Sequence, residues 1–226
     1  MDKDNGLHYL NVLLFGNDQV GKTSTGNLIL DIELLNNVNF DRETGYPVCN
    51  INTTERFPGK LILIIDTPGF GQSRRRVIEA IKRKKVEFSS REGTFAVLFV
   101  VKANRVSDRD CRESIQSFEE VFGRQFSGRV IVVVTHLDKV GGNMSIESFL
   151  GYCGRQLRRF ITERNLRVCF FDNLTKNNDI RMAQAETLIS MIKHEENTKS
   201  WNFLNWSAAA VVVAGIALAA VYAIRL

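Results

Sequence analysis

The stretch GNDQVGKTSTGNLIL occupies residues 16–30 and directly follows an apolar run at residues 9–15. Its first half matches the pattern G-x-x-x-x-G-K-[ST], in which backbone N–H groups of a glycine-rich loop surround a chain of phosphates. The lysine reaches the outer phosphates, and the hydroxyl completes a magnesium shell. The loop therefore predicts a nucleoside triphosphate site. The expected nucleotide-binding residues are Gly16, Asn17, Asp18, Gln19, Val20, Gly21, Lys22, Thr23 and Ser24.

The rest of the 226-residue chain alternates short apolar runs with longer helical patterns. Strands are predicted at residues 9–15, 53–57, 60–65, 95–101, 130–134 and 167–171. Helices are predicted at residues 22–30, 74–88, 108–122, 145–164 and 180–196. Nearly continuous apolar strands are typical of a sheet that is buried on both faces, and Pro58-Gly59 predicts a hairpin turn. This alternation predicts an α/β fold with a doubly wound, mostly parallel sheet.

The segment DTPG, residues 66–69, ends the predicted strand at residues 60–65. In GTPases an aspartate at this place holds Mg²⁺, usually through water, and the glycine senses the γ-phosphate. Asp66 and Thr23 are therefore expected metal ligands, and Gly69 is expected to contact the nucleotide.

The segment THLD, residues 135–138, is similar to the guanine-reading pattern [NT]-K-x-D. The carboxylate of Asp138 would accept two hydrogen bonds from guanine, and adenine lacks that donor pair. His136 stands where lysine is usual and could lie over the base, with Leu137 beside it. Asn173, which follows the apolar run RVCFF, is expected near the guanine O6.

Taken together, these motifs resemble the GTPases of immunity-associated proteins, over about residues 8–175. GNDQVGKTSTGNLIL, DTPGF, THLD and RVCFFDN carry the resemblance, along with the segment at residues 93–123, which is similar to a box found in that family. The resemblance implies a G domain of the septin-like branch of P-loop GTPases that binds GTP or GDP with Mg²⁺. It also implies nucleotide-controlled homodimers or homo-oligomers formed through the G domain, and attachment to intracellular membranes.

The chain departs from the family in its switch segment, which reads TGYPVCN at residues 44–50. The family's usual threonines are missing there, so the switch residue that coordinates Mg²⁺ has several candidates. Thr44 is the first choice, and Thr53 and Thr54 are the alternatives.

Hydrolysis is left open by the sequence. Efficient GTPases place a glutamine directly after D-x-x-G to orient water, and this chain has Phe70 there, with Gln72 two residues later. Slow intrinsic hydrolysis of GTP is therefore expected. Arg105 aligns with an arginine that acts across the dimer in an active relative and is the catalytic candidate. It could equally be an exposed loop arginine or an ion-pair partner.

The C-terminal tail has 17 uncharged residues at 208–224, flanked by Trp206 and Arg225. About 17 residues is the lower limit for spanning a bilayer as a helix. We therefore expect a G domain at residues 1–196 facing the cytosol, a linker at 197–206 and a transmembrane tail anchor at 207–226 in an intracellular membrane. The alternative is a terminal helix that is buried in the domain or in a dimer.

The chain has a net charge of +5, with basic runs around residues 74–76, 82–85 and 155–159. Such runs are most often solvated helix faces, and less often contacts for an anionic membrane or an acidic partner. Nucleic acid is not expected as a partner, because no aromatic stacking motif accompanies the charge. The four cysteines lack paired spacing and are interpreted as free thiols.

The sequence as a whole predicts a membrane-anchored guanine-nucleotide switch that dimerises when GTP is bound. One alternative is a GTP-binding scaffold on intracellular membranes without useful turnover. A less favoured alternative is a preprotein receptor of the chloroplast-envelope type. A generic P-loop ATPase is the least favoured, because of Asp138.

Overall fold

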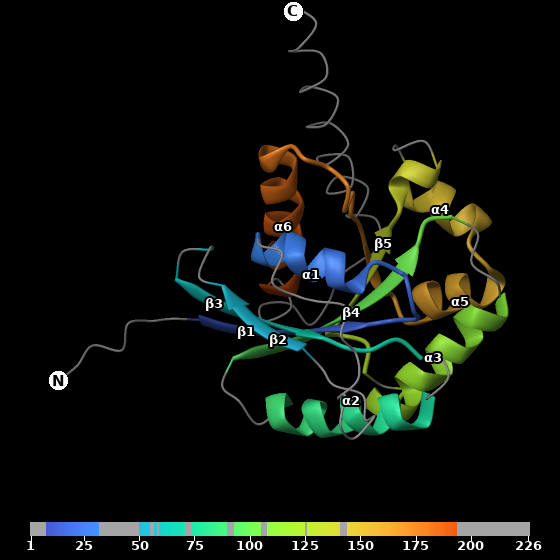
Figure 1. Ribbon diagram of the computed structural model, residues 1–226. Helices are drawn as coiled ribbons and strands as arrows, with labels where there is room; N and C mark the ends of the chain where they lie inside the picture. The colour runs from blue at the N-terminus through green and yellow to red at the C-terminus, as the bar shows by residue number, and fades with distance from the viewer. Residues whose placement is uncertain are drawn as a thin grey trace, which may run out of the picture.

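The computed structural model describes residues 8–31, 50–54, 57, 59–70, 74–89, 93–104, 108–124, 126–140 and 144–193 (Figure 1). In this part of the chain a six-stranded sheet has the order β2-β3-β1-β4-β5-β6. The strands are β1 (His8–Phe15), β2 (Asn50–Thr54), β3 (Lys60–Asp66), β4 (Thr94–Lys102), β5 (Val130–Thr135) and β6 (Arg167–Phe170). Within this sheet only β2 runs antiparallel to its neighbour, and the other paired strands are parallel. The predicted doubly wound, mostly parallel sheet is confirmed.

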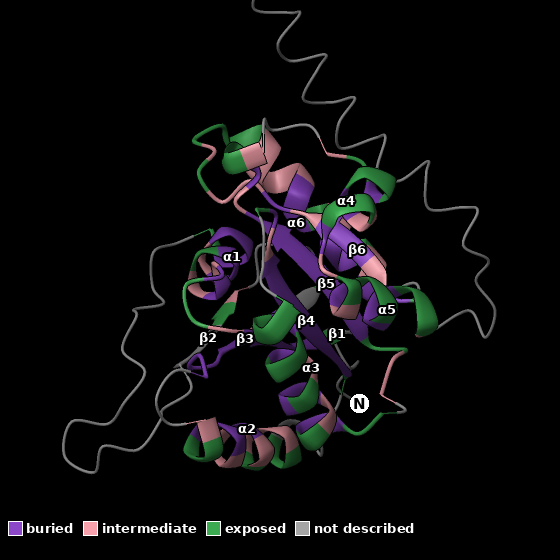
Figure 2. Ribbon diagram, turned by 90° about the vertical axis from the view of Figure 1, so that its right-hand side faces the viewer, coloured by how far each residue is buried: buried purple, intermediate pink, exposed green. Residues whose placement is uncertain are grey.

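Helices cover both faces of this sheet (Figure 1). They are α1 (Lys22–Leu30), α2 (Arg74–Ser89), α3 (Asp108–Phe122), the 3-10 helix η1 (Leu137–Val140), α4 (Ile146–Tyr152), α5 (Arg155–Glu163) and α6 (Asn178–Lys193). The buried side chains form two cores, one between the sheet and α1 and α6, and one between the sheet and α2, α3, α4 and α5. Successive side chains of a strand point to opposite faces, so β1 contributes Leu10 and Leu14 to the first core and Leu13 and Phe15 to the second. Figure 2 shows the strands buried between the helical layers.

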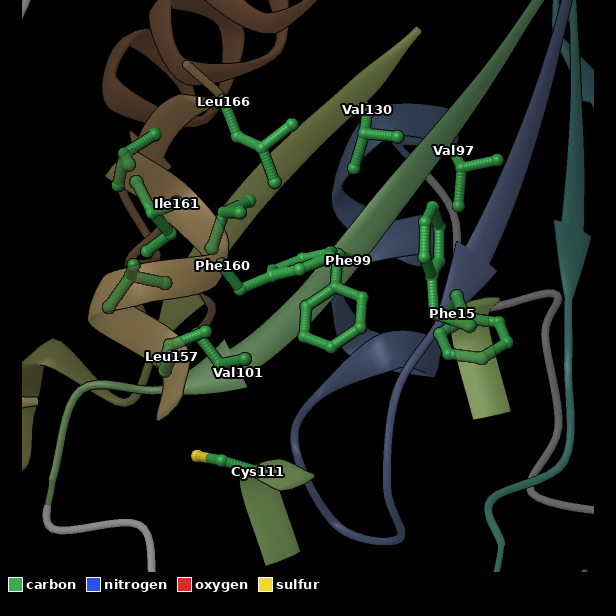
Figure 3. Close-up of a cluster of buried hydrophobic side chains, with 14 of the residues drawn as sticks. Phe15, Val97, Phe99, Val101, Cys111, Val130, Leu157, Phe160, Ile161 and Leu166 are labelled. Carbon is green, nitrogen blue, oxygen red and sulfur yellow. The ribbon is translucent and has the colours of Figure 1, made fainter. Parts of the chain in front are cut away.

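Phenylalanine rings dominate the core under α3 and α5. Phe15 stacks on Phe99 with centroids 5.8 Å apart, and Phe99 packs against Phe160 at 5.1 Å (Figure 3). Phe118 meets Phe15 edge-on at 5.5 Å. Each such pair is worth about 0.5–1.5 kcal/mol beyond the area it buries. The cluster therefore holds β1 and β4 together near their C-terminal ends. The phosphate loop directly follows β1.

The strand order reverses direction at β1. The chain passes from β1 to β3 on one side, and then returns across β1 to β4, β5 and β6 on the other. In open α/β sheets ligands bind at such a switch point, beyond the carboxyl ends of the strands. The motifs predicted from the sequence follow β1, β3, β5 and β6, so the topology brings them to one edge.

One predicted helix is wrong: the pattern at residues 145–164 forms α4 and α5, not a single helix. Cys153 and Gly154 have extended ψ angles of 148° and 149°, which end the first helix. Gly154 lies so close to Asp108 that a Cβ on this glycine would clash with Asp108 Oδ1 and lie 3.2 Å from its Cγ. Asp108 Oδ1 also accepts a hydrogen bond from the Gln156 N–H at 3.4 Å. The break between the two helices therefore lies in contact with α3.

The predicted hairpin is confirmed, since β2 and β3 pair antiparallel, although β2 begins and ends earlier than expected. Among the described residues no helix is both long enough and apolar enough to cross a membrane. The predicted linker at 197–206 and the predicted anchor at 207–226 lie outside those residues. Thr44 and Arg105 lie outside them as well.

Candidate functional site: a phosphate-loop pocket

The phosphate loop connects β1 to α1. Gly21, which immediately precedes α1, has φ +89°, a left-handed conformation that glycine adopts without strain. The helix begins at Lys22, so the backbone N–H groups of its first turn have no partner within the helix. These groups and the helix dipole favour an anion at this position.

Lys22 is buried in the loop, with a side chain that turns back over it. Its Nζ donates to the backbone carbonyls of Asn17 at 2.6 Å and Gly16 at 3.1 Å. Burial lowers the pKa of the ammonium, and the charges of Asp66 and Asp18 oppose this effect. The lysine is thus held where phosphate oxygens of a bound nucleotide would meet it.

Thr23 and Asp66 form the metal side of the site. Thr23 Oγ1 donates to Asp66 Oδ2 at 2.6 Å, and Asp66 is only 2% exposed. Its other oxygen, Oδ1, is buried and has no hydrogen-bond partner within the described part of the chain. Burial raises the pKa of this carboxyl, against the opposing effects of the Thr23 hydrogen bond and the Lys22 charge. A buried carboxylate oxygen without a partner, next to a hydroxyl, fits a divalent cation or its bound water.

The protein supplies few ligands for such a cation. No group of three or more His, Cys, Asp or Glu side chains in the described ranges could hold a metal. Mg²⁺ is commonly bound through one or two protein oxygens, phosphate oxygens and water, so the pair Thr23 and Asp66 fits a metal that arrives with the nucleotide.

The register of β2 bears on the alternative metal ligands. Thr53 pairs with Leu63 and Thr54 with Ile62, whereas Asn50 pairs with Asp66. Thr53 thus lies three positions from Asp66 along the ladder, roughly 10 Å at about 3.3 Å per residue. The structure does not favour Thr53 or Thr54 as magnesium ligands.

Thr135 and His136 connect the base side of the site to the phosphate loop. Thr135 Oγ1 donates to the backbone carbonyl of Val20 at 2.7 Å and lies 2.9 Å from His136 Nδ1. His136 has φ +57°, which turns the chain sharply at the end of β5. Burial and the charge of Lys102 lower the pKa of its imidazole, and Asp138 opposes them. The ring is therefore neutral near pH 7.

Asp138 lies in η1, where its carboxylate pairs with Lys139 at 3.3 Å. Asn173 follows β6 and donates from Nδ2 to Thr25 Oγ1 at 3.2 Å and to the Gly21 carbonyl at 3.3 Å. Its Oδ1 is buried without a hydrogen-bond partner among the described residues. Asn173 therefore ties the loop after β6 to the phosphate loop, a contact that the sequence pattern did not predict.

These residues surround a pocket of about 700 Å³, a volume typical of small-molecule sites. The lining residues are Asp18, Gln19, Gly21, Lys22, Thr23, Ser24, Thr67, His136, Asp138, Lys139, Asn173 and Leu174. Gly16, Asn17, Val20, Asp66, Gly69 and Leu137 are not on the lining. Thr67, Lys139 and Leu174 were missed by the sequence reasoning. Leu174 is 69% exposed and directly follows the FDN motif, which is the one signal that could have found it.

A protein-family model described as the AIG1 family matches residues 10–207. The chain belongs to the AIG1 family. The resemblance to immunity-associated GTPases is thereby confirmed, and the chain carries an AIG1-type GTP-binding G domain. This AIG1-family chain is 24% identical over 192 residues to the human GTPase IMAP family member 8, covering 84% of this chain and 28% of that protein. It is 29% identical over 188 residues to immune-associated nucleotide-binding protein 1 of Arabidopsis thaliana, covering 80% and 82%.

Solved structures share the fold of this AIG1-family chain. A dimerization-deficient mutant of Toc33 from Arabidopsis thaliana has a TM-score of 0.62 and 18% identity, covering 85% of this chain and 86% of Toc33. Toc33 in complex with GDP and Mg²⁺ has a TM-score of 0.57 and 19% identity, with the same coverage. A third structure carries the description that dimerization is important for the GTPase activity of atToc33 and psToc159 (TM-score 0.59, 20% identity, covering 86% and 85%). At these identities the likeness establishes the fold alone.

Proposed function

We propose that this AIG1-family protein is a guanine-nucleotide switch that binds GTP and GDP with Mg²⁺. The observation that carries the proposal is the pairing of Thr23 with Asp66 beneath the phosphate loop, with one buried carboxylate oxygen left for a metal. Asp138 lines the same pocket in η1, directly after β5, and it is proposed to accept hydrogen bonds from guanine. The complex of Toc33 with GDP and Mg²⁺ supports the assignment by its fold.

The experiment that tests this function is equilibrium binding of GDP with Mg²⁺ to the full chain. GDP is expected to bind, and a hundredfold excess of ATP is expected not to displace it. Asp138→Asn should weaken GDP binding roughly 10- to 100-fold, because each hydrogen bond to a charged group contributes about 1.5–3 kcal/mol. Glu147→Gln, which removes an exposed carboxylate of α4 away from the pocket, should leave binding unchanged. Equal affinity for GDP and ATP would contradict the proposal.

Turnover is proposed to be slow in the monomer and faster in a dimer formed through the G domain. Phe70, which follows Gly69, is 8% exposed and packs on Phe15 with centroids 5.0 Å apart. Its ring therefore lies in the core and cannot orient water. Help from a second copy is the proposed route, with Arg105 as the candidate group. The description that links dimerization of atToc33 and psToc159 to GTPase activity supports this route.

The burial of Phe70 also favours a second candidate function, a GTP-binding scaffold that does not turn over usefully. In this case nucleotide binding would order a surface for assembly, and hydrolysis would play no part. The two functions differ in one observable, the turnover per molecule at high protein concentration.

The C-terminal segment at residues 207–226 is proposed to anchor the G domain to an intracellular membrane, with the domain in the cytosol. The proposal rests on its 17 uncharged residues at 208–224. Co-sedimentation with phospholipid vesicles by the full chain, and not by a chain ending at residue 200, is the expected result. Equal sedimentation of the two chains would contradict the proposal that residues 207–226 anchor the protein.

A further inference from the structure

The phosphate loop makes a direct contact with the D-x-x-G segment through Asp18 and Gly69. A Cβ built on Gly69 would clash with Asp18 Oδ1 and would lie 2.5 Å from Asp18 Cγ and 2.7 Å from Asp18 Cα. Both the side chain and the backbone of Asp18 therefore rest on Gly69. Only the missing side chain of glycine allows the two loops to approach so closely.

The position of this carboxylate matters because of what Gly69 is expected to do. A glycine in this motif senses the γ-phosphate, which carries negative charge. Asp18 lines the pocket and lies near enough to Lys22 for its charge to act on the ammonium. If Gly69 contacts the γ-phosphate as its motif predicts, a bound triphosphate would bring that phosphate against Asp18, and both groups would compete for Lys22. A diphosphate ends one phosphate earlier and avoids most of this conflict.

The other carboxylates of the site are not expected to repel the outermost phosphate. Asp66 is buried beside Thr23, on the side where a cation would neutralise it. Asp138 lies in η1 at the base end and pairs with Lys139. Among the described residues that line the pocket, Asp18 is the acidic group in contact with Gly69, the glycine that the motif predicts to sense the γ-phosphate.

From this contact we propose that Asp18 is a specificity-determining residue that makes the pocket favour guanosine diphosphate over guanosine triphosphate. The proposal rests on the function proposed above, namely that the pocket binds guanine nucleotides. Triphosphate binding then requires the Asp18 carboxylate to leave Gly69.

The test compares affinities for GDP and for GMPPNP, a non-hydrolysable triphosphate analogue, with Mg²⁺ and the full chain. The unsubstituted protein is expected to bind GDP about tenfold more tightly than GMPPNP, a difference of about 1.4 kcal/mol. Asp18→Asn keeps the shape and removes the charge, and it should bring the two affinities within about twofold by tightening GMPPNP more than GDP. Glu147→Gln makes the same change in net charge outside the pocket and should keep the tenfold preference.

Two further variants keep the result interpretable. Asp18→Gly removes the side chain, so it should lose the preference as Asp18→Asn does, and Asp18→Glu should retain it. An unchanged ratio of affinities in Asp18→Asn and Asp18→Gly, with GDP still bound, would overturn the role of Asp18 alone. Failure of the unsubstituted chain to bind either nucleotide would instead overturn the proposed function.

Discussion

At the scale of single residues, the buried thiol of Cys169 makes a prediction about alkaline pH. Burial raises the pKa of Cys169 to about 12, from an ordinary value of 9.0. Above pH 9 the thiol ionises in the unfolded chain and stays protonated in the folded protein, so the unfolded state binds fewer protons. Stability therefore falls as the pH rises from about 9 to 12, by up to about 1.4 kcal/mol per pH unit for this thiol.

Urea unfolding between pH 8 and pH 10.5 checks this expectation. Cys169→Ala should lower the stability at pH 8, because it leaves a small cavity, yet it should show a flatter decline above pH 9. Burial likewise raises the pKa of Cys111 to about 12, so part of the decline should persist in that variant. Parallel declines in the parent and in Cys169→Ala would contradict the assignment.

Single residues also show what a sequence pattern can and cannot predict. The positions of Lys22 and Asp66 at one edge of the sheet were predictable, because each is fixed by its place in a short motif that follows a strand. The hydrogen bonds of Asn173 to Gly21 and Thr25 were not, since they join segments about 150 positions apart. The contact of Asp18 with Gly69 was hidden for the same reason: it depends on how two loops approach each other.

At the scale of elements, the N-terminus of α5 depends on a carboxylate that another helix supplies. Asp108, in the first turn of α3, accepts a hydrogen bond from the Gln156 N–H. Asp108→Ala should cost about 1 kcal/mol, the usual value of an N-terminal cap, with a further contribution from the helix dipole. Asp110→Ala, a change in the same turn of α3, should cost less. Urea unfolding measures the loss of stability in both variants. Equal losses would contradict the conclusion that Asp108 caps α5.

A double-mutant cycle sharpens this test. Gly154→Ala should displace the Asp108 carboxylate and lose the cap, because the added Cβ would clash with Asp108 Oδ1. The same substitution should cost little once Asp108 is alanine, so the two losses should not add. The contact with Asp108 is also a reason why the sequence pattern at residues 145–164 predicted one helix, since a local pattern does not show it. The break between α4 and α5 lies against Asp108, which is far away in the sequence.

At the scale of the whole molecule, the sheet brings the site together, and a second copy could complete it. The alternation of apolar strands and helices was enough to predict the parallel sheet, and the sheet in turn places the segments after β1, β3, β5 and β6 at one edge. The chemistry at that edge is nonetheless incomplete for hydrolysis within the described residues, because Phe70 packs into the core on Phe15. Asn17 donates from Nδ2 to the Asp110 carbonyl at 3.3 Å, so the phosphate loop contacts the start of α3. Arg105 precedes that start by three residues in the sequence.

This arrangement predicts GTP turnover that depends on protein concentration. Turnover per molecule should rise as the full chain is concentrated and should level off once dimers dominate, while Arg105→Ala should stay flat at the low monomer rate. An arginine supplied across a dimer can add roughly 10³- to 10⁵-fold to the rate. Arg109→Ala, which removes an exposed arginine paired with Glu113 on α3, is the matched control and should keep the rise. Turnover that is negligible at every concentration, with GTP tightly bound, would instead identify the protein as a scaffold, because assembly would then proceed without hydrolysis.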